Sequence, residues 1–426
     1  MRHNRGMAPP SAHQNSASES TSADSALSKP VLSESPLAST SPTSRRSAGA
    51  ASPATLLVGA KPAPVLDPAG DVVDVTRDIV NIESVSGNEG RLADAVEAVL
   101  RSAAHLRVER DGDTVVARTN LGRPTRVVIA GHLDTVPLAD NLPATFRTRD
   151  GIDELVGRGT VDMKGGVASQ LKAAAQVHSP VHDVTWIFYD HEEVAAEDNA
   201  LTRIAATRPE LLAGDFAILG EPTAGAVEGG CKGTMRCDIR TRGVAAHSAR
   251  DWVGHNAIHD LAPVLTRLAS YTAREVTIDG LVYRECLNAV RISGGIAGNV
   301  IPDGACVTVN YRFAPDRDVA AAEAHIREVL AGLDVEITVT DSAPGALPGL
   351  SHPVAQEFVT ALGPDAMVRA KQGWTDVARF SALGVPAINF GPGDPLLAHT
   401  DDEHVPLSQL RECHDVLVTW LTGGAR

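Results

Sequence analysis

The chain has 426 residues, of which 43% are hydrophobic and 4% aromatic, so we expect two or three domains with cores of Val, Leu, Ile and Ala. The formal net charge of −15 argues against a general affinity for nucleic acid or an anionic membrane, because no basic field exists to collect phosphates. The five cysteines are scattered without a CxxC pair, and no apolar run could span a bilayer. These features predict a reduced, cytoplasmic protein without disulfides or a cysteine-based zinc site.

Residues 1–68 differ in composition from the rest of the chain. Ser, Ala, Pro and Thr dominate them, and no hydrophobic periodicity is present. Such a segment cannot bury enough apolar surface to fold. We expect a disordered tail, or a start that has been placed too far upstream.

From Asp71 onward the pattern predicts an α/β fold. Val72–Ile82 and Glu89–Ala103 have helical spacing, and short apolar runs then alternate with helix-like segments. This alternation favours a mostly parallel sheet with flanking helices. We expect this larger domain in two parts, residues 69–231 and 344–426.

Between residues 232 and 343 the pattern changes. Met235–Arg242 and Ala305–Phe313 alternate like strands, and Ala257–Ala273 has helical spacing. These features predict a smaller α+β domain, inserted into the first as a lid or dimerisation domain.

Four predicted strands lead to side chains that can bind a metal. The strands are Val127–Ala130, Trp186–Tyr189, Phe216–Leu219 and Ala387–Phe390, and they lead to His132, to Glu192 and Glu193, to Glu221 and to His399. In open α/β sheets, ligands bind at the carboxyl ends of the strands. We therefore expect these residues to form one site.

Three motifs at these strand ends and in the loops between them can take part in a metal site. Asp134 could accept a hydrogen bond from one imidazole nitrogen of His132 and leave the other free for a metal, although an isolated His-x-Asp is usually a solvated loop pair. Asp162 lies in a glycine-rich segment, Gly157–Gly166, that suits a tight loop before a helix from Val167 to Val177. A phosphate-binding loop is the alternative, but the spacing fits neither the dinucleotide nor the Walker pattern. An acid at the entrance of that helix could instead bridge two metals. Of the adjacent Glu192 and Glu193, one can ligate while the other faces a water; a solvated acidic loop is the alternative.

Charge balance supports a two-metal centre. Two zinc ions carry four positive charges, which Asp162, Glu193, Glu221 and a bridging hydroxide would neutralise, with the imidazoles of His132 and His399 neutral. Nitrogen and oxygen ligands suit zinc, with cobalt or manganese as substitutes. Such a centre lowers the pKa of a water to about 7 and polarises an amide carbonyl.

Five motifs in this order resemble the dinuclear zinc deacylase and carboxypeptidase family. They are His132-Leu133-Asp134, Asp162-Met163-Lys164-Gly165-Gly166, Glu192-Glu193, Glu221-Pro222-Thr223 and the late His399. The resemblance covers the chain from Asp71 onward. His191 departs from the pattern, because many members have a third acid there, but that position is not a ligand in the family.

The resemblance implies a role for each residue of the site. His132, Asp162 and Glu221 would surround one metal, and Asp162, Glu193 and His399 the other. Glu192 would be the general base, with Asp134 as a further catalytic residue. The implied enzyme is a metal-dependent amide hydrolase with two divalent ions per subunit.

The segments 230–234, 246–250, 373–380 and 390–395 are most similar to one branch of this family. That branch hydrolyses N-succinyl-LL-2,6-diaminopimelate to succinate and LL-2,6-diaminopimelate. The alternatives are another N-acyl-amino-acid deacylase or exopeptidase and, in a different class, a non-catalytic relative that binds metal or amino acids. The three carboxylates of the substrate need fixed cations, and the expected substrate-binding residues are Arg312, Arg379, Thr375, Asn299 and Lys232. A surface ion pair is the alternative for either arginine.

His247 lies outside the metal-binding segments. A lone histidine near a loop is more often structural or solvated. The resemblance implies instead that His247 stabilises the tetrahedral oxyanion, often in the active site of a partner subunit. We therefore expect a homodimer.

Overall fold

The computed structural model describes residues 64–424. The predicted tail of residues 1–68 lies outside the described residues, apart from 64–68. Among residues 64–424, no helix is both long and apolar enough to cross a bilayer.

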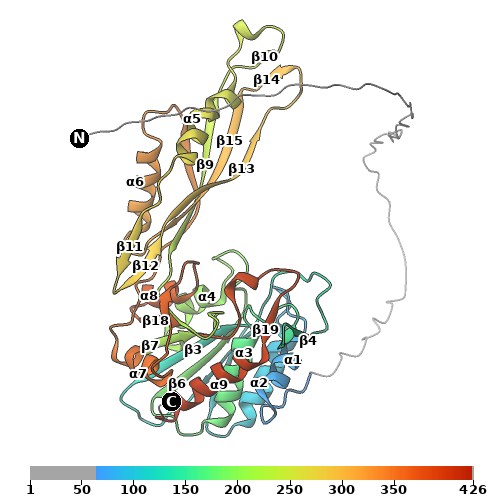
Figure 1. Cartoon of the computed structure of the whole chain (residues 1–426), viewed down its shortest axis with the longest axis vertical. Coiled ribbons are helices and arrows are strands. Elements are labelled where there is room, and N and C mark those ends of the chain that lie inside the picture. The colour runs from blue at the N-terminus through green and yellow to red at the C-terminus, as the bar shows by residue number, and fades with distance from the viewer. Residues whose placement is uncertain (1–63, 425–426) are drawn as a thin grey trace, which may run out of the picture. The chain divides into compact units, whose positions relative to one another are not determined.

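An eight-stranded sheet forms the centre of the larger domain (Figure 1). In spatial order its strands are β1 (Arg107–Asp111), β2 (Thr114–Arg118), β6 (Asp183–Tyr189), β3 (Arg126–His132), β7 (Phe216–Leu219), β18 (Ala387–Asn389), β8 (Val227–Gly229) and β17 (Val368–Ala370). The four central strands β6, β3, β7 and β18 run parallel. The predicted fold class, a mostly parallel sheet with flanking helices, is confirmed.

Helices cover both faces of this sheet, so side chains along a strand alternate between two hydrophobic cores. Val127 and Ile129 face one core, whereas Val128 and Ala130 face the other. The first core includes α1 (Val72–Val80), α2 (Gly90–Ser102), α3 (Lys164–Gln176), α7 (Pro353–Ala361) and α9 (Leu407–Leu421); the second includes α4 (Ala200–Thr207), the 3-10 helix η1 (Pro209–Leu211) and α8 (Val377–Ala382). Near-continuous apolar strands are typical of sheets buried on both faces.

Helix α3 begins three residues before the predicted start at Val167. Gly165 and Gly166, expected in a loop, instead form its first turn. A Cβ on Gly166 would lie 2.1 Å from the carbonyl oxygen of Gly220. These glycines therefore permit the helix to approach the end of β7, and so bring the segment that carries Asp162 close to the sheet.

A second sheet lies within residues 233–343 and is antiparallel throughout. Its strands are, in order, β13 (Cys286–Gly294), β15 (Gly304–Phe313), β9 (Gly233–Arg242) and β16 (Glu336–Ala343). Alternate side chains of β9 and β15 are buried against α5 (Ala257–Ala269) and α6 (Val319–Val329). We call this sheet with its two helices the lid; the division of the chain at residues 232 and 343 stays a prediction.

Shorter elements complete the described part of the chain. They are the sheet β19 (His404–Pro406), β5 (Ile152–Val156), β4 (Thr145–Arg149), the pair β10 (Ala246–His247) and β14 (Val300–Ile301), the pair β11 (Glu275–Ile278) and β12 (Leu281–Arg284), and the 3-10 helices η2 (Asp251–Val253) and η3 (Pro395–Leu397). In Figure 1, β10 and β14 lie at one end of β9, β13 and β15, and β11 and β12 at the other.

Candidate active site

The parallel strands bring the predicted ligands to one edge of the central sheet. His132 is the last residue of β3, Glu192 and Glu193 follow β6, and Glu221 follows β7. His399 lies in the loop between β18 and β19. The site expected from the strand ends therefore exists as a spatial cluster.

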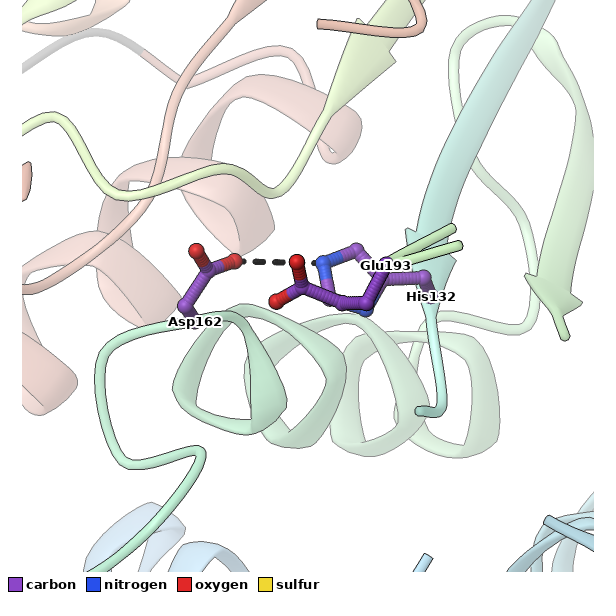
Figure 2. Close-up of side chains that lie close together, drawn as sticks. All are labelled: His132, Asp162 and Glu193. Atoms are coloured by element: carbon purple, nitrogen blue, oxygen red, sulfur yellow. Dashed lines mark hydrogen bonds and ion pairs between the residues drawn. The ribbon is translucent and has the colours of Figure 1, made fainter. Parts of the chain in front are cut away.

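Asp162 lies between the two predicted histidine ligands. Its Oδ1 is 3.1 Å from Nε2 of His132, and its Oδ2 is 3.3 Å from Nε2 of His399. The same nitrogen of His399 is 3.0 Å from Oε1 of Glu193. Potential ligand atoms of His132, Asp162 and Glu193 lie within 4.8 Å of one another, and Figure 2 shows these three side chains pointing toward one another. A carboxylate between two imidazoles has the position that a bridging ligand requires.

Glu221 is buried beside this group without a hydrogen-bond donor for one of its oxygens. Its Oε1 has no partner among the described residues. Burial, followed by the negative charge of Asp162, raises the pKa of Glu221 to about 7. An unpartnered buried carboxylate oxygen is costly unless a cation neutralises it, so the donor set fits a divalent metal.

His132 is oriented mainly by a backbone carbonyl. Its Nδ1 is 3.0 Å from the carbonyl oxygen of Asp134 and 3.5 Å from Oδ1 of the same residue. We expected the carboxylate as the partner, and the carbonyl is closer. A carbonyl oxygen can only accept, which places the proton on Nδ1 and turns Nε2 toward Asp162.

The carboxylate of Asp134 instead holds the turn that carries the two glutamates. Oδ1 accepts the backbone N–H of Glu192 at 3.0 Å, and Oδ2 accepts that of Glu193 at 3.0 Å. Oδ2 also accepts the hydroxyl of Ser86 at 2.7 Å. Burial opposes ionisation, but His132 and these hydrogen bonds lower the pKa of Asp134 to about 2. Asp134 therefore stays ionised and fixes the direction of both glutamates.

Glu192 has the electrostatic setting of a proton acceptor. Burial raises the pKa of its carboxyl well above the ordinary value; nearby His132 opposes this, and Asp376, Glu221 and Glu193 add to it. A raised pKa makes the carboxylate a stronger proton acceptor, which a general base requires. Cations bound to the neighbouring carboxylates would reduce the repulsion.

Two cavities open beside the cluster. One, of about 840 Å³, is lined by Glu192 and Glu193 on one side and by Arg236, Arg312 and Arg379 among others. The second, of about 510 Å³, is lined by Asp162, Glu221, Lys371 and Thr375 among others, and Trp374 lines both. These volumes suit small molecules, and cationic side chains line both cavities.

The predicted substrate-binding residues are only partly free to bind a ligand. Arg312 donates from Nε to Oδ1 of Asn310 at 3.1 Å and lines the larger cavity. Arg379 donates to Asp376 and to Thr202, with its guanidinium 5.3 Å from the ring centre of Trp374.

The polar groups of Thr375 and Lys232 already make hydrogen bonds within the protein. Thr375 lines the smaller cavity while its hydroxyl donates to Oδ1 of Asn389 at 2.9 Å. The ammonium of Lys232 donates to the carbonyl of Arg284 at 2.7 Å.

His247 and Asn299 lie together, but not at the cluster. The backbone N–H of Ser248 donates to the carbonyl of Asn299 at 2.9 Å. His247 pairs with Val300 in the β10–β14 pair, and Asn299 directly precedes β14. This pair follows the Arg242 end of β9, whereas Arg312 pairs with Thr234 at the other end. At about 3.3 Å per residue, these ends of β9 are roughly 25 Å apart. Within one chain, His247 is therefore remote from Glu192.

Sequence reasoning missed Glu403. Its carboxylate accepts three backbone N–H groups from the segment that leads to Asp162. In the sequence it follows Asp401 and Asp402, which are exposed. Nothing in that acidic run distinguishes the one buried carboxylate from its neighbours.

The chain is similar to known proteins over most of its length. Residues 128–422 match the model of peptidase family M20/M25/M40. The Mycobacterium tuberculosis protein named "Putative succinyl-diaminopimelate desuccinylase DapE" is 54% identical over 84% of this chain and 100% of its own length. The succinyl-diaminopimelate desuccinylase of Corynebacterium glutamicum is 48% identical over 84% of this chain and 98% of its own.

Solved structures share the fold at low sequence identity. A tripeptidase from Staphylococcus aureus has a TM-score of 0.68 at 19% identity, covering 84% of this chain and 98% of its own. The YXEP protein of Bacillus subtilis, described as a dinuclear metal-binding peptidase of the M20 family, has a TM-score of 0.60 at 16% identity, covering 82% and 96%. The chain therefore belongs to peptidase family M20/M25/M40, which confirms the resemblance drawn from the five motifs and the expected class, a metal-dependent amide hydrolase.

Proposed function

We propose that this enzyme hydrolyses N-succinyl-LL-2,6-diaminopimelate to succinate and LL-2,6-diaminopimelate. The observation that carries the proposal is the pair Glu192 and Glu193 on the wall of a cavity that also presents Arg236 and Arg312. Relatives with 54% and 48% identity bear the corresponding name. A tricarboxylate substrate is matched by guanidinium groups close to the carboxylates that perform the chemistry.

The donor set supports two divalent ions, with zinc as the first choice and cobalt as a substitute. We assign His132, Asp162 and Glu221 to one ion and Asp162, Glu193 and His399 to the other. Asp162 is within 3.3 Å of both imidazoles, which supports a bridging role. When bound, such ions activate a water and polarise the amide carbonyl.

Glu192 moves the proton in this proposal. Its carboxylate accepts a proton from the attacking water, whose oxygen bonds to the amide carbon. The carbon–nitrogen bond then breaks, and Glu192 delivers the proton to the leaving amine. Asp134 holds the backbone N–H of Glu192 at 3.0 Å, so that the carboxyl is positioned before substrate binds.

A direct comparison of substrates tests the proposal. The purified enzyme is assayed with N-succinyl-LL-2,6-diaminopimelate, N-acetyl-ornithine and simple N-acyl amino acids. We expect the highest kcat/KM for the succinylated substrate. Preference for N-acetyl-ornithine would assign the chain to another deacylase, and no hydrolysis by the metal-loaded protein would favour a non-catalytic binding role.

We further propose a homodimer formed through the lid. Strand β13 is an edge strand, paired only with β15 among the described residues. Its Val290 and Ile292 are exposed, as are Ile258 of α5 and Trp252 before it. An exposed apolar edge strand is a template for pairing with another chain, and a two-fold dimer would cover it. A partner lid could also bring His247 to a site that it cannot reach in its own chain.

Cytoplasmic action is the proposed setting, since diaminopimelate synthesis precedes cell-wall assembly. The free thiols of Cys231, Cys237, Cys286 and Cys306 are typical of a reducing compartment.

A further inference from the structure

A buried ion pair beside the candidate ligands has no role in the function proposed above. Nη1 of Arg158 lies 2.8 Å from Oε2 of Glu403, and their side chains are only 4% and 1% exposed. Removing two charges from water is costly, and apolar residues in their place often leave a protein equally stable. Stability is therefore a poor explanation of this pair.

The second oxygen of Glu403 holds the segment that carries Asp162. Oε1 accepts the backbone N–H of Gly159 at 2.9 Å, of Val161 at 3.0 Å and of Asp162 at 3.1 Å. Three donors on one oxygen fix the backbone up to the residue whose carboxylate lies between His132 and His399.

Arg158 extends the connection to two further loops. Its Nη1 also donates to the carbonyl of Thr400 at 3.2 Å, next to His399. Its Nε donates to the carbonyl of Pro137 at 3.2 Å, in the segment that follows His132. The backbone N–H of Gly157 donates to the carbonyl of Glu403 at 2.9 Å. One buried pair thus contacts the loops of three candidate ligands.

We propose that Arg158 and Glu403 form a clamp that sets the relative positions of the His132, Asp162 and His399 loops, with Glu403 as a positioning residue for metal binding. The inference rests on the proposed metal-binding function, but not on the identity of the substrate. Residues behind metal ligands typically cost 10–100-fold in metal affinity when changed. The clamp acts in this way through backbone atoms.

Zinc titration of the metal-free full-length chain tests the clamp. For Glu403→Gln we expect zinc affinity to fall by about 10–100-fold and the absorption spectrum of the cobalt-loaded protein to change. Thermal unfolding of the metal-free protein measures the stability that is lost when Arg158 is left unpaired, and the control Glu154→Gln should keep wild-type zinc affinity. Glu154 is a suitable control because it is also buried and paired with arginine, accepting from Arg147 at 3.0 and 2.8 Å.

A second variant covers the case in which Glu403→Gln fails to fold because Arg158 is left unpaired. The double variant Arg158→Met/Glu403→Gln removes both charges and should fold, yet bind zinc as weakly. A folded variant of either kind with wild-type zinc affinity would overturn the proposal, and so would failure of both to fold. Since zinc binding is measured without substrate, an enzyme that binds zinc but ignores the succinylated substrate would contradict only the proposed function.

Discussion

The carboxylate of Asp134 accepts the backbone N–H of Glu192 at 3.0 Å. The same side chain accepts the next N–H, that of Glu193, so one buried anion holds the backbone of two adjacent glutamates. Both glutamates line the larger cavity, and Oε1 of Glu193 also lies 3.0 Å from Nε2 of His399. The different roles proposed for the two residues lead to the first prediction.

Glu192→Gln should keep its metals and lose catalysis. The amide is a poor proton acceptor, so turnover should fall by about 10²–10⁴-fold, the usual contribution of general acid–base catalysis. Metal content by elemental analysis should stay at the wild-type level. Glu197→Gln is the matched control, because Glu197 lines the same cavity but is exposed. Near wild-type turnover of Glu192→Gln would mean that Glu192 is not the base.

Chelation should abolish activity without unfolding the chain. The two cores on either face of the central sheet are apolar and do not include the candidate ligands, so circular dichroism should still show a cooperative thermal transition. Activity should return when zinc or cobalt is added to the metal-free protein. Full activity after exhaustive chelation, with metal absent by elemental analysis, would contradict the conclusion that hydrolysis requires a metal ion.

Asp183 should stabilise the fold in a pH-dependent way. It accepts the backbone N–H of Leu121 at 2.7 Å and of Arg123 at 2.9 Å, and the hydroxyl of Thr119 at 2.9 Å. Burial opposes ionisation, but these hydrogen bonds hold the pKa of Asp183 below its ordinary value of 3.8. The stabilisation is therefore complete above pH 3.8 and is lost as the pH falls through the lower pKa of the folded state.

The measurement is urea unfolding of Asp183→Asn against wild type. At pH 7 the variant should be less stable by about 1–3 kcal/mol, since a buried network loses its anion. The difference should shrink below pH 3.8. Asp198→Asn, at an exposed position, should show neither effect, and a pH-independent loss in Asp183→Asn would point to packing rather than charge.

Deletion of residues 1–60 should leave the enzyme unchanged. The segment has a Ser-, Pro- and Ala-rich composition without hydrophobic periodicity, so it offers little apolar surface to dock. We expect equal turnover and equal thermal midpoints for the truncated and full-length chains. A clear loss of either quantity would mean that the tail packs on the fold.

The cluster of candidate ligands was predictable because the signal for it is local in the sequence. His132, Glu192 and Glu193 each stand at or just after the end of an apolar strand. Because these strands pair in parallel, their carboxyl ends lie side by side and bring the side chains together. Glu403 was not predictable, since its contacts depend on how a loop folds back onto residues 159–162. The prediction that Gly165 and Gly166 lie in a loop was wrong for a similar reason. They lie in the first turn of α3, and the close approach of Gly166 to Gly220 is a tertiary contact. The pairing of Arg379 with Asp376 likewise depends on packing.

The last prediction is that His247 serves the active site of a partner subunit. His247 lies at the far end of the lid sheet from Arg312. Among the described residues, the imidazole of His247 has one hydrogen-bond partner, the backbone N–H of Ala249, from which Nδ1 accepts at 3.1 Å. It is exposed, so His247→Ala should keep the fold and both metals. If His247 donates to the oxyanion, turnover should fall on the order of a hundredfold or more. Sedimentation should report a dimer.

Mixing the His247→Ala and Glu192→Gln chains separates the two possible arrangements. In a hybrid dimer, the site on the His247→Ala chain keeps Glu192 and receives His247 from its partner. After complete subunit exchange, half of the dimers are hybrids with one competent site, so we expect about a quarter of wild-type turnover. The control mixes His247→Ala with the double variant His247→Ala/Glu192→Gln, which can build no competent site. Recovery only in the first mixture places His247 across the interface, whereas no recovery after exchange has been confirmed by mass spectrometry would assign it to its own chain or to no catalytic role.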